Sequence, residues 1–408
     1  MFNTITRTKR NAEKHALLAA LFEKTSKGLL LYLSCIGVIH AQSLNAQYDI
    51  DLLKNTSGGK ARATEYVDLL SLSVDDNFTF SEDTSISYYA SAIYSNGHSF
   101  SQDIVGDDHI VSNLEGGARF TKLAEVWIDL QYKNSALLFG LYDINAEFDV
   151  LESANLFINS GHGIGNDIGL TGANGPSIYP FYSLALRYKY QINAHHQFLI
   201  AMMDGFPGDP ESPNAVDIDL DLEQGVFTIA EWQYTIDNVR WLFGAWQYSK
   251  SQVIDQSERA DRKSGNFGLY LRHERLLISP DTLNALNSLK VHGFFRLGLS
   301  DDKFNKYDSF ASAGLVFSNF SAQRPNDSFG LAFAYTGLGD RFTNMEGLLD
   351  NEGLPAQFAN GELNLELSYQ APVNKYITLQ PMLQYVVEPS GFEQENALIT
   401  GLRLSLSF

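Results

Sequence analysis

The sequence predicts an all-β protein, a transmembrane antiparallel β-barrel of about 16 strands around a water-filled lumen. Three observations support this. From about Tyr66 to Phe408, units of roughly ten residues alternate between polar and apolar side chains and end in Gly, Asn, Asp or Pro. Aromatic residues make up 12% of the chain, with 27 Phe and 20 Tyr. After the N-terminal region, no apolar run reaches the roughly 18 residues that a transmembrane helix needs.

The alternation is clearest in four segments: Lys290–Leu299, Ser328–Tyr335, Glu362–Tyr369 and Leu398–Phe408. Successive side chains of a strand point to opposite faces, so Leu365 is expected to face lipid and Glu366 the lumen. A soluble sandwich would alternate in the same way. Here, however, the polar face carries Arg, Lys and Glu beside small residues, and many strands end in an aromatic residue. Aromatic residues at strand ends are typical of a barrel in a membrane.

The length of the repeating region sets the size of the barrel. Residues 64–408, at roughly 20–22 residues for each strand and its connection, give about 16 strands. A barrel of that size encloses an aqueous lumen, whereas one of eight strands does not. We expect the longest irregular stretches to form external loops or to fold into the lumen. They are Gly97–Asn113, Ser153–Pro180, Asp204–Gln224 and Asn344–Ala359.

The N-terminal region reads as a signal peptide covering residues 1–46. It is basic, contains a short apolar run from Leu29 to Ile39, and ends in small residues that a signal peptidase could recognise. We favour cleavage after Ala46, with cleavage after Ser43 as the second choice. Residues 47–63 are expected to form a short N-terminal segment, with the barrel covering residues 64–408.

Charge and composition exclude other classes of protein. The net charge of −19 does not suit a nucleic-acid partner. His195 and His196 lack the spacing of a metal site, and no Ser/His/acid set stands out. We therefore expect no cofactor, no metal site and no enzymatic activity. The acidic stretch Asp217–Glu223 could bind a cation, but it lacks the turn glycine of an EF-hand, and a solvated loop or strand face is favoured.

Three segments resemble the carbohydrate-selective porin family (the OprB type). Residues 125–148 contain Glu125-Val126-Trp127 and then a strand that leads into Gly140-Leu141-Tyr142-Asp143-Ile144-Asn145. Residues 379–391 contain Gln380-Pro381-Met382-Leu383-Gln384-Tyr385, followed by Glu388-Pro389-Ser390-Gly391. The third segment is the closing strand, residues 397–408. One departure is Ser390, where the family usually has a second glycine.

The resemblance implies a 16-stranded, sugar-permeable porin in the outer membrane of a Gram-negative cell. Its function would be passive, substrate-selective diffusion of mono- or small oligosaccharides into the periplasm. A general or anion-selective porin of the same architecture is the alternative. Phe408, at the end of the last alternating strand, resembles the signal read by the barrel assembly machinery. Whether the barrel is a monomer or a homotrimer stays open.

Several polar side chains fall on strand faces that the alternation assigns to the lumen. Charged side chains there could hydrogen-bond to sugar hydroxyls, and Trp127 could stack on a sugar ring. The competing interpretation is a structural ladder of charges across the barrel wall, and the two readings are compatible. The candidates are Arg187, Arg296, Glu366, Arg403, Glu125, Trp127, Glu231 and Gln384, together with Arg272 and Gln380.

Overall fold

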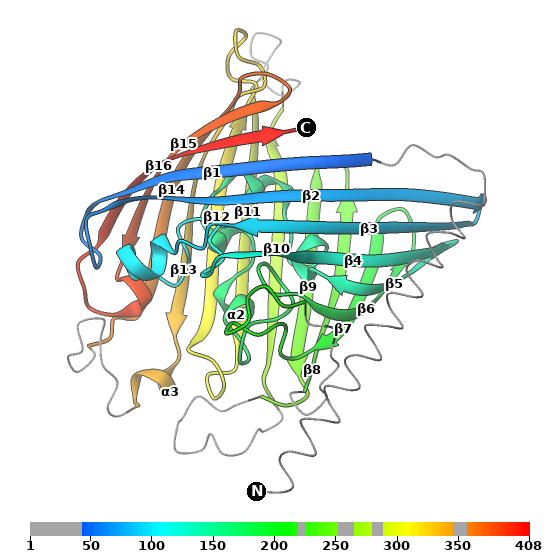
Figure 1. Cartoon of the computed structure of the whole chain (residues 1–408), viewed down its shortest axis with the longest axis horizontal. Helices are drawn as coiled ribbons and strands as arrows, with labels where there is room; N and C mark the ends of the chain where they lie inside the picture. Colours follow the sequence, from blue (N-terminus) through cyan, green and yellow to red (C-terminus); the bar gives the residue numbers. More distant parts are fainter. Residues whose placement is uncertain (1–42, 217, 219–224, 252–264, 280–288, 346–356) are drawn as a thin grey trace, which may run out of the picture. The chain divides into compact units, whose positions relative to one another are not determined.

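The computed structural model describes residues 43–216, 218, 225–251, 265–279, 289–345 and 357–408. These residues form sixteen antiparallel strands in one closed barrel, in which each strand pairs with its neighbours along the chain and β1 pairs with β16 (Figure 1). The predicted fold class and strand number are confirmed. The strands are β1 Ser43–Ser57, β2 Thr64–Ser81, β3 Thr84–Ser95, β4 Phe120–Tyr132, β5 Ser135–Tyr142, β6 Ser183–Gln191, β7 His196–Asp204, β8 Val226–Ile236, β9 Val239–Tyr248, β10 Phe267–Ile278, β11 Lys290–Ser300, β12 Tyr307–Ser318, β13 Ser328–Leu338, β14 Gly361–Pro372, β15 Ile377–Val387 and β16 Ala397–Ser407.

The barrel closes through the pairing of β1 with β16, which we call the closing seam. The register of the seam runs from Gln47 opposite Ser407 to Ser57 opposite Leu398. The prediction that residues 47–63 lie outside the barrel is therefore wrong for Gln47–Ser57. The physical reason is that an unpaired edge strand cannot stay in a membrane, so β1 must supply the partner of β16.

The predicted signal peptide falls mostly on residues 1–42, outside the described residues. The first residues of β1, Ser43 to Asn45, pair with β2 alone, whereas Ala46 exchanges backbone hydrogen bonds with Phe408. Cleavage after Ala46 stays a prediction. It would leave the register of the seam from Gln47 onward in place.

The two ends of the barrel differ in the length of their connections. At the end where the chain enters β1 and leaves β16, the turns include residues 82–83, 133–134, 192–195, 237–238 and 373–376. At the other end, the connections include residues 96–119, 143–182, 205–225 and 339–360. In outer-membrane barrels the short turns face the periplasm and the long loops face outward, so the seam begins at the periplasmic end.

The outer face of the barrel is apolar. Large side chains such as Leu123, Leu269, Leu299, Leu331 and Leu365 are exposed on it and would contact lipid. Aromatic pairs collect toward the periplasmic strand ends, as expected at a membrane interface. They include Tyr188 with Tyr190, Trp232 with Tyr234, and Phe317 with Phe329. Among the described residues, no helix is long and apolar enough to span a bilayer.

Two long connections fold back into the barrel. We call residues 96–119 the first inward segment and residues 143–182 the second inward segment. The first contains η1 (Ser101–Val105); the second contains η2 (Ile144–Ala146), η3 (Glu152–Leu156), η4 (Ser160–His162) and α2 (Asn166–Gly169). Both bury apolar side chains against the inner wall, for example Phe100 in the first segment and Phe148 in the second. The external connections also carry α3 (Asp340–Thr343) and η7 (Pro389–Gly391).

Candidate functional site: an inward-folded segment and the passage beside it

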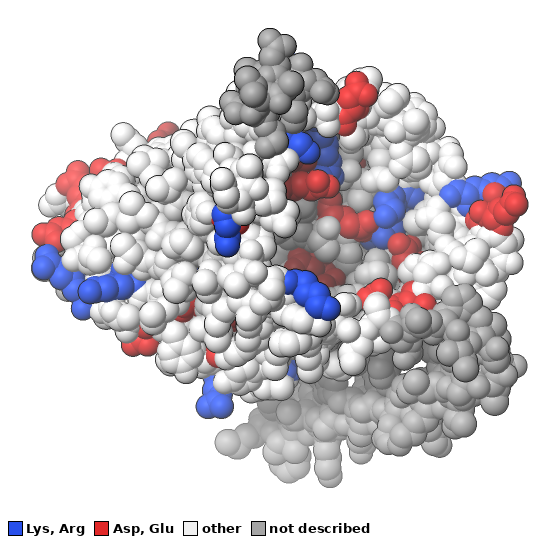
Figure 2. All heavy atoms as spheres, turned by 90° about the horizontal axis from the view of Figure 1, so that it is seen from above, with Lys and Arg blue, Asp and Glu red and all other residues white. Residues whose placement is uncertain are grey.

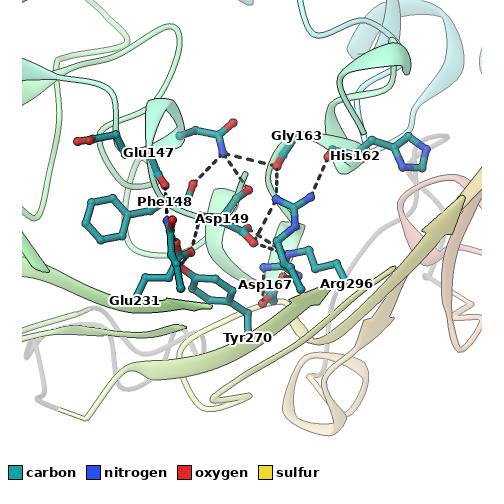
Figure 3. Close-up of polar contacts among 12 residues, drawn as sticks. Glu147, Phe148, Asp149, His162, Gly163, Asp167, Glu231, Tyr270 and Arg296 are labelled. Atoms are coloured by element: carbon teal, nitrogen blue, oxygen red, sulfur yellow. Dashed lines mark hydrogen bonds and ion pairs between the residues drawn. The ribbon is translucent and has the colours of Figure 1, made fainter. Parts of the chain in front are cut away.

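The second inward segment is fixed to the wall by a buried ion-pair network centred on Arg296 of β11 (Figure 3). Arg296 Nε donates to both carboxylate oxygens of Asp149, at 2.9 and 3.0 Å. The other two guanidinium nitrogens donate to the two oxygens of Asp167, at 2.6 and 3.1 Å. All three side chains are fully buried. A planar guanidinium suits this arrangement because it can bridge two carboxylates at once.

Neighbouring strands extend the network. Arg272 of β10 lies 3.3 Å from Asp149 and donates to the backbone oxygens of His162 and Gly163 at 3.1 and 3.0 Å. Glu231 of β8 accepts the backbone N–H of Asp149 at 2.9 Å. Three strands thus hold the same stretch of the second inward segment.

Two glycines make room for the Arg296–Asp167 pair. A Cβ atom built on Gly165 or Gly298 would collide with both the guanidinium of Arg296 and the carboxylate of Asp167. Gly165 belongs to the glycine-rich run 161–165, which superficially resembles a phosphate-binding loop but has no lysine. Gly165 instead leaves room for the Arg296–Asp167 ion pair to pack closely against the backbone.

Farther along the barrel wall, β14 and β15 hold the segment with hydrogen bonds. Glu366 accepts the backbone N–H groups of Ile158 and Asn159 at 2.8 and 2.9 Å. The amide of Gln384 donates to the carbonyl of Val111 at 2.8 Å, and its oxygen accepts from Asn159 at 3.3 Å. Gln384 therefore contacts both inward segments.

β6 provides a further contact with the second inward segment. Arg187 donates to Glu147 at 2.6 Å and to Asp129 at 2.8 Å, and Lys189 donates to Glu147 at 2.8 Å. Burial alone would raise the pKa of Glu147, but Arg187 and Lys189 outweigh it and lower this pKa below its ordinary value. Glu147 is consequently ionised near neutral pH.

The structure separates the sequence-predicted lumen residues into two groups. The first group faces the barrel interior as predicted but is buried beneath the inward segments, with exposed fractions of 0–3%. The members of this group are Arg187, Glu231, Arg296, Glu366 and Gln384. Their polar atoms bond to protein groups, so their geometry is that of anchors for the inward segments. The second group comprises Arg403, Glu125 and Trp127, which lie on β16 and β4.

A cavity of about 340 Å³ lies beside the inward segments, against β1–β4 and β16. Its polar lining comprises Asp49, Ser71, Ser91, Asn113, Glu125 and Arg403, and its aromatic lining comprises Tyr89, Tyr179 and Tyr182. Acidic and basic side chains also gather in the hollow of the face seen in Figure 2. Polar groups that can bind hydroxyls, placed beside aromatic rings that can stack on a sugar ring, are suited to binding a sugar.

Arg403 forms one wall of the cavity and crosses the closing seam. It donates to both oxygens of Asp51 on β1, each at 2.7 Å. It also donates to Asn113 of the first inward segment at 2.7 Å. Its side chain is 11% exposed, so a small part of it is open to the cavity.

Glu125 forms the facing wall. Its Oε2 atom accepts from Trp127 Nε1 at 3.3 Å and from the backbone N–H of Asp143 at 3.2 Å. The Trp127 ring stacks on Tyr89, with ring centroids 5.4 Å apart and planes inclined by 20°. Tyr89 rather than Trp127 is a lining residue of the cavity, and Trp127 supports it from the side.

Known proteins resemble this chain in sequence and in fold. The model of the "Carbohydrate-selective porin, OprB family" matches residues 85–408. The chain belongs to this family. Porin B of Pseudomonas aeruginosa is 25% identical over 346 residues, which cover 77% of this chain and 75% of that protein. The structure of Pseudomonas putida OprB at high pH has 19% identity and a TM-score of 0.74, covering 90% of this chain and 94% of that one. The low-pH structure has a TM-score of 0.52 at 16% identity, with 90% and 92% covered.

The chain is thus an outer-membrane, multi-pass β-barrel and a carbohydrate porin. Sequence reasoning missed Asp149 and Asp167, the two carboxylates of this porin that bind Arg296. A signal existed: buried arginines require carboxylate partners, and both aspartates lie in or beside the irregular stretch Ser153–Pro180. The alternation could not show which aspartates meet which arginines, because that depends on how the loop folds.

The acidic stretch Asp217–Glu223, for which a solvated loop or strand face is favoured over a cation site, lies almost wholly outside the described residues. Among the residues that are described, no cluster of three or more His, Cys, Asp or Glu side chains could hold a metal ion.

Proposed function

We propose that this porin provides passive, substrate-selective diffusion of mono- or small oligosaccharides into the periplasm through the cavity between the inward segments and β1–β4 with β16. The cavity lining carries the proposal: it combines Arg403, Glu125 and Asn113 with the ring of Tyr89. Charged groups give strong hydrogen bonds to neutral hydroxyls, and a ring face suits the C–H groups of a sugar. A transport path needs modest affinity, so we expect dissociation constants in the millimolar range, about 4 kcal/mol.

Within this proposal, the two groups of lumen residues have different roles. Arg403 and Glu125 contact the sugar directly, with Trp127 holding Tyr89 as the stacking surface. The buried group of Arg187, Glu231, Arg296, Glu366 and Gln384 keeps the inward segments in place, so that the passage stays narrow. The family is one of channels, and we propose no enzymatic activity for this chain.

Replacing Tyr89 with alanine tests the passage. Neutral monosaccharides are expected to block the ion current of the wild-type channel in a saturable way. The variant is expected to need about two- to tenfold more sugar for half block, the range for loss of an aromatic contact. Half-blocking concentrations in planar bilayers measure this.

Tyr188→Ala serves as the matched control, since Tyr188 lies on the lipid-facing surface. An equal loss of block in both variants would contradict the passage. A wild-type current that ignores every neutral sugar but saturates with phosphate would instead identify an anion-selective porin.

We also propose that Phe408 is read by the barrel assembly machinery. Its side chain is 71% exposed and stacks on Tyr376, with ring centroids 5.7 Å apart, so it is accessible to a partner. Phe408→Ala is expected to lower the amount of folded barrel in cells, measured by heat-modifiable gel mobility, without changing the conductance of the channels that form. Tyr376→Ala, which removes the stack but keeps Phe408, is the control. Equal yields of Phe408→Ala and wild type would rule the proposal out.

A further inference from the structure

The charges on the cavity wall do not balance. One cationic side chain, Arg403, and two carboxylates, Asp49 and Glu125, line the cavity. The charge of Arg403 is already matched, because its guanidinium is bound in a bidentate way to Asp51. Among the described residues, neither Asp49 nor Glu125 has a cationic group within ion-pair distance. The cavity therefore has an excess of negative charge.

The hydrogen-bond partners of both carboxylates are neutral donors. Asp49 accepts from the amide of Gln47 at 3.0 Å, and Glu125 accepts from the indole of Trp127 and the backbone of Asp143. Neutral donors of this kind do not cancel the charge of a carboxylate. Burial, reinforced by the charge of Glu125, raises the pKa of Asp143 to about 8, so Asp143 is protonated at neutral pH.

The aromatic side of the cavity supplies the rest of a sugar site. Tyr89 is held by its stack on Trp127, and the hydroxyl of Tyr179 donates to the carbonyl of Leu114 at 2.8 Å. Both rings are thus fixed before a ligand arrives, which lowers the entropic cost of binding. The wall offers ring faces, hydroxyl-binding groups and two unmatched negative charges in one place.

We propose that the passage favours cationic amino sugars, whose ammonium group pairs with Glu125 and Asp49, over neutral sugars, and that it disfavours sugars bearing a carboxylate or phosphate. This inference rests on the proposed function, because it concerns the same passage. The negative charge of the whole chain acts in the same direction by raising the local concentration of cations at the channel mouth.

Three monosaccharides that share one ring test the proposal: glucosamine, glucose and glucuronate. Their half-blocking concentrations are measured with the purified full-length channel in planar bilayers at mildly acidic pH, where the amine is charged. We expect glucosamine to block at about two- to fivefold lower concentration than glucose, the range for a partly solvated ion pair. Glucuronate should be the weakest blocker. Raising the salt concentration should narrow the difference.

Two variants test whether Glu125 and Asp49 cause the preference for glucosamine over glucose. Glu125→Gln is expected to remove most of the preference for glucosamine over glucose, and Asp49→Asn to reduce it. Glu82→Gln, in the exposed turn between β2 and β3, removes the same charge far from the cavity and should leave the preference unchanged. If Glu125→Gln fails to fold, Asp49→Asn and the salt dependence still test whether negative charge in the cavity causes the preference for glucosamine.

The failures of the two proposals are distinguishable. A wild-type channel that glucose and glucosamine block equally well would overturn the charge preference and leave sugar passage standing. A preference for glucosamine that survives in both Glu125→Gln and Asp49→Asn would overturn the assignment to these carboxylates. A wild-type channel that none of the three sugars blocks would overturn the proposed passage itself.

Discussion

Replacing Arg296 with alanine is expected to loosen the contact of residues 149–167 with the barrel wall and to widen the channel. The variant leaves Asp167 buried with no cation within ion-pair distance among the described residues, and leaves Asp149 with Arg272 alone. Removing one partner of a buried ion pair costs about 3–5 kcal/mol. At about 1.4 kcal/mol for each factor of ten, even the lower figure shifts the attached-to-detached ratio by more than a hundredfold.

The measurement is single-channel conductance, which should rise while half block by neutral sugars weakens. Heat-modifiable mobility should show that the barrel itself still forms, because its strands do not depend on the segment. Arg296→Lys is an informative second variant, since a lysine keeps the charge but cannot bridge two carboxylates in the plane of a guanidinium. Arg324→Ala, which removes a half-exposed arginine from a periplasmic turn, is the control. An unchanged conductance in Arg296→Ala would contradict the anchoring role.

Placing an arginine at Leu365 is expected to destabilise the folded barrel by about 2–4 kcal/mol, because the charge would face hydrocarbon near the middle of β14. Leu365 is exposed on the lipid face, between Phe333 of β13 and Tyr385 of β15. Urea titration of folding into lipid vesicles measures the effect. Leu365→Ala, which shortens the side chain without adding charge, should cost much less. Equal losses in the two variants would show that Leu365 does not face lipid.

The adjacent residue shows how contacts change an expectation from sequence. The alternation alone predicts that Glu366→Gln folds normally and alters ion selectivity. The contacts predict a different result for this variant. A glutamine has only one of the two acceptor oxygens that bind the backbone N–H groups of Ile158 and Asn159. Leaving one of these buried N–H groups without an acceptor costs about 1–3 kcal/mol. The barrel should still form, but with a looser second inward segment.

Apart from β1, the strands of this porin were predictable because they obey a local rule. The four segments chosen for their alternation all lie in strands: β11, β13, β14 and β16. The assignment of Leu365 to lipid and Glu366 to the interior is also confirmed. Strand number followed from length, since a membrane fixes how long each strand must be.

The start of the barrel and the interior were not predictable in the same way. β1 begins at Ser43 although its alternation is weak, because the need to pair with β16 outweighs local pattern. Which wall residues would be covered depended on how residues 143–182 fold, and that path is set by long-range pairs such as Arg296 with Asp149 and Asp167. No periodicity in the sequence encodes a contact between residues more than a hundred positions apart.

The closing seam has a consequence for how this protein becomes functional. The first and last strands are the two ends of the chain's path around the barrel, and they meet beside the proposed passage. Asp49 and Asp51 arrive with β1, and Arg403 arrives with β16. A partly inserted chain could have β2 to β15 in place and still lack this part of the cavity lining, because β1 and β16 have not yet paired. Completion of insertion and the onset of selectivity would then be a single event, so an intermediate that leaks ions should discriminate poorly between sugars.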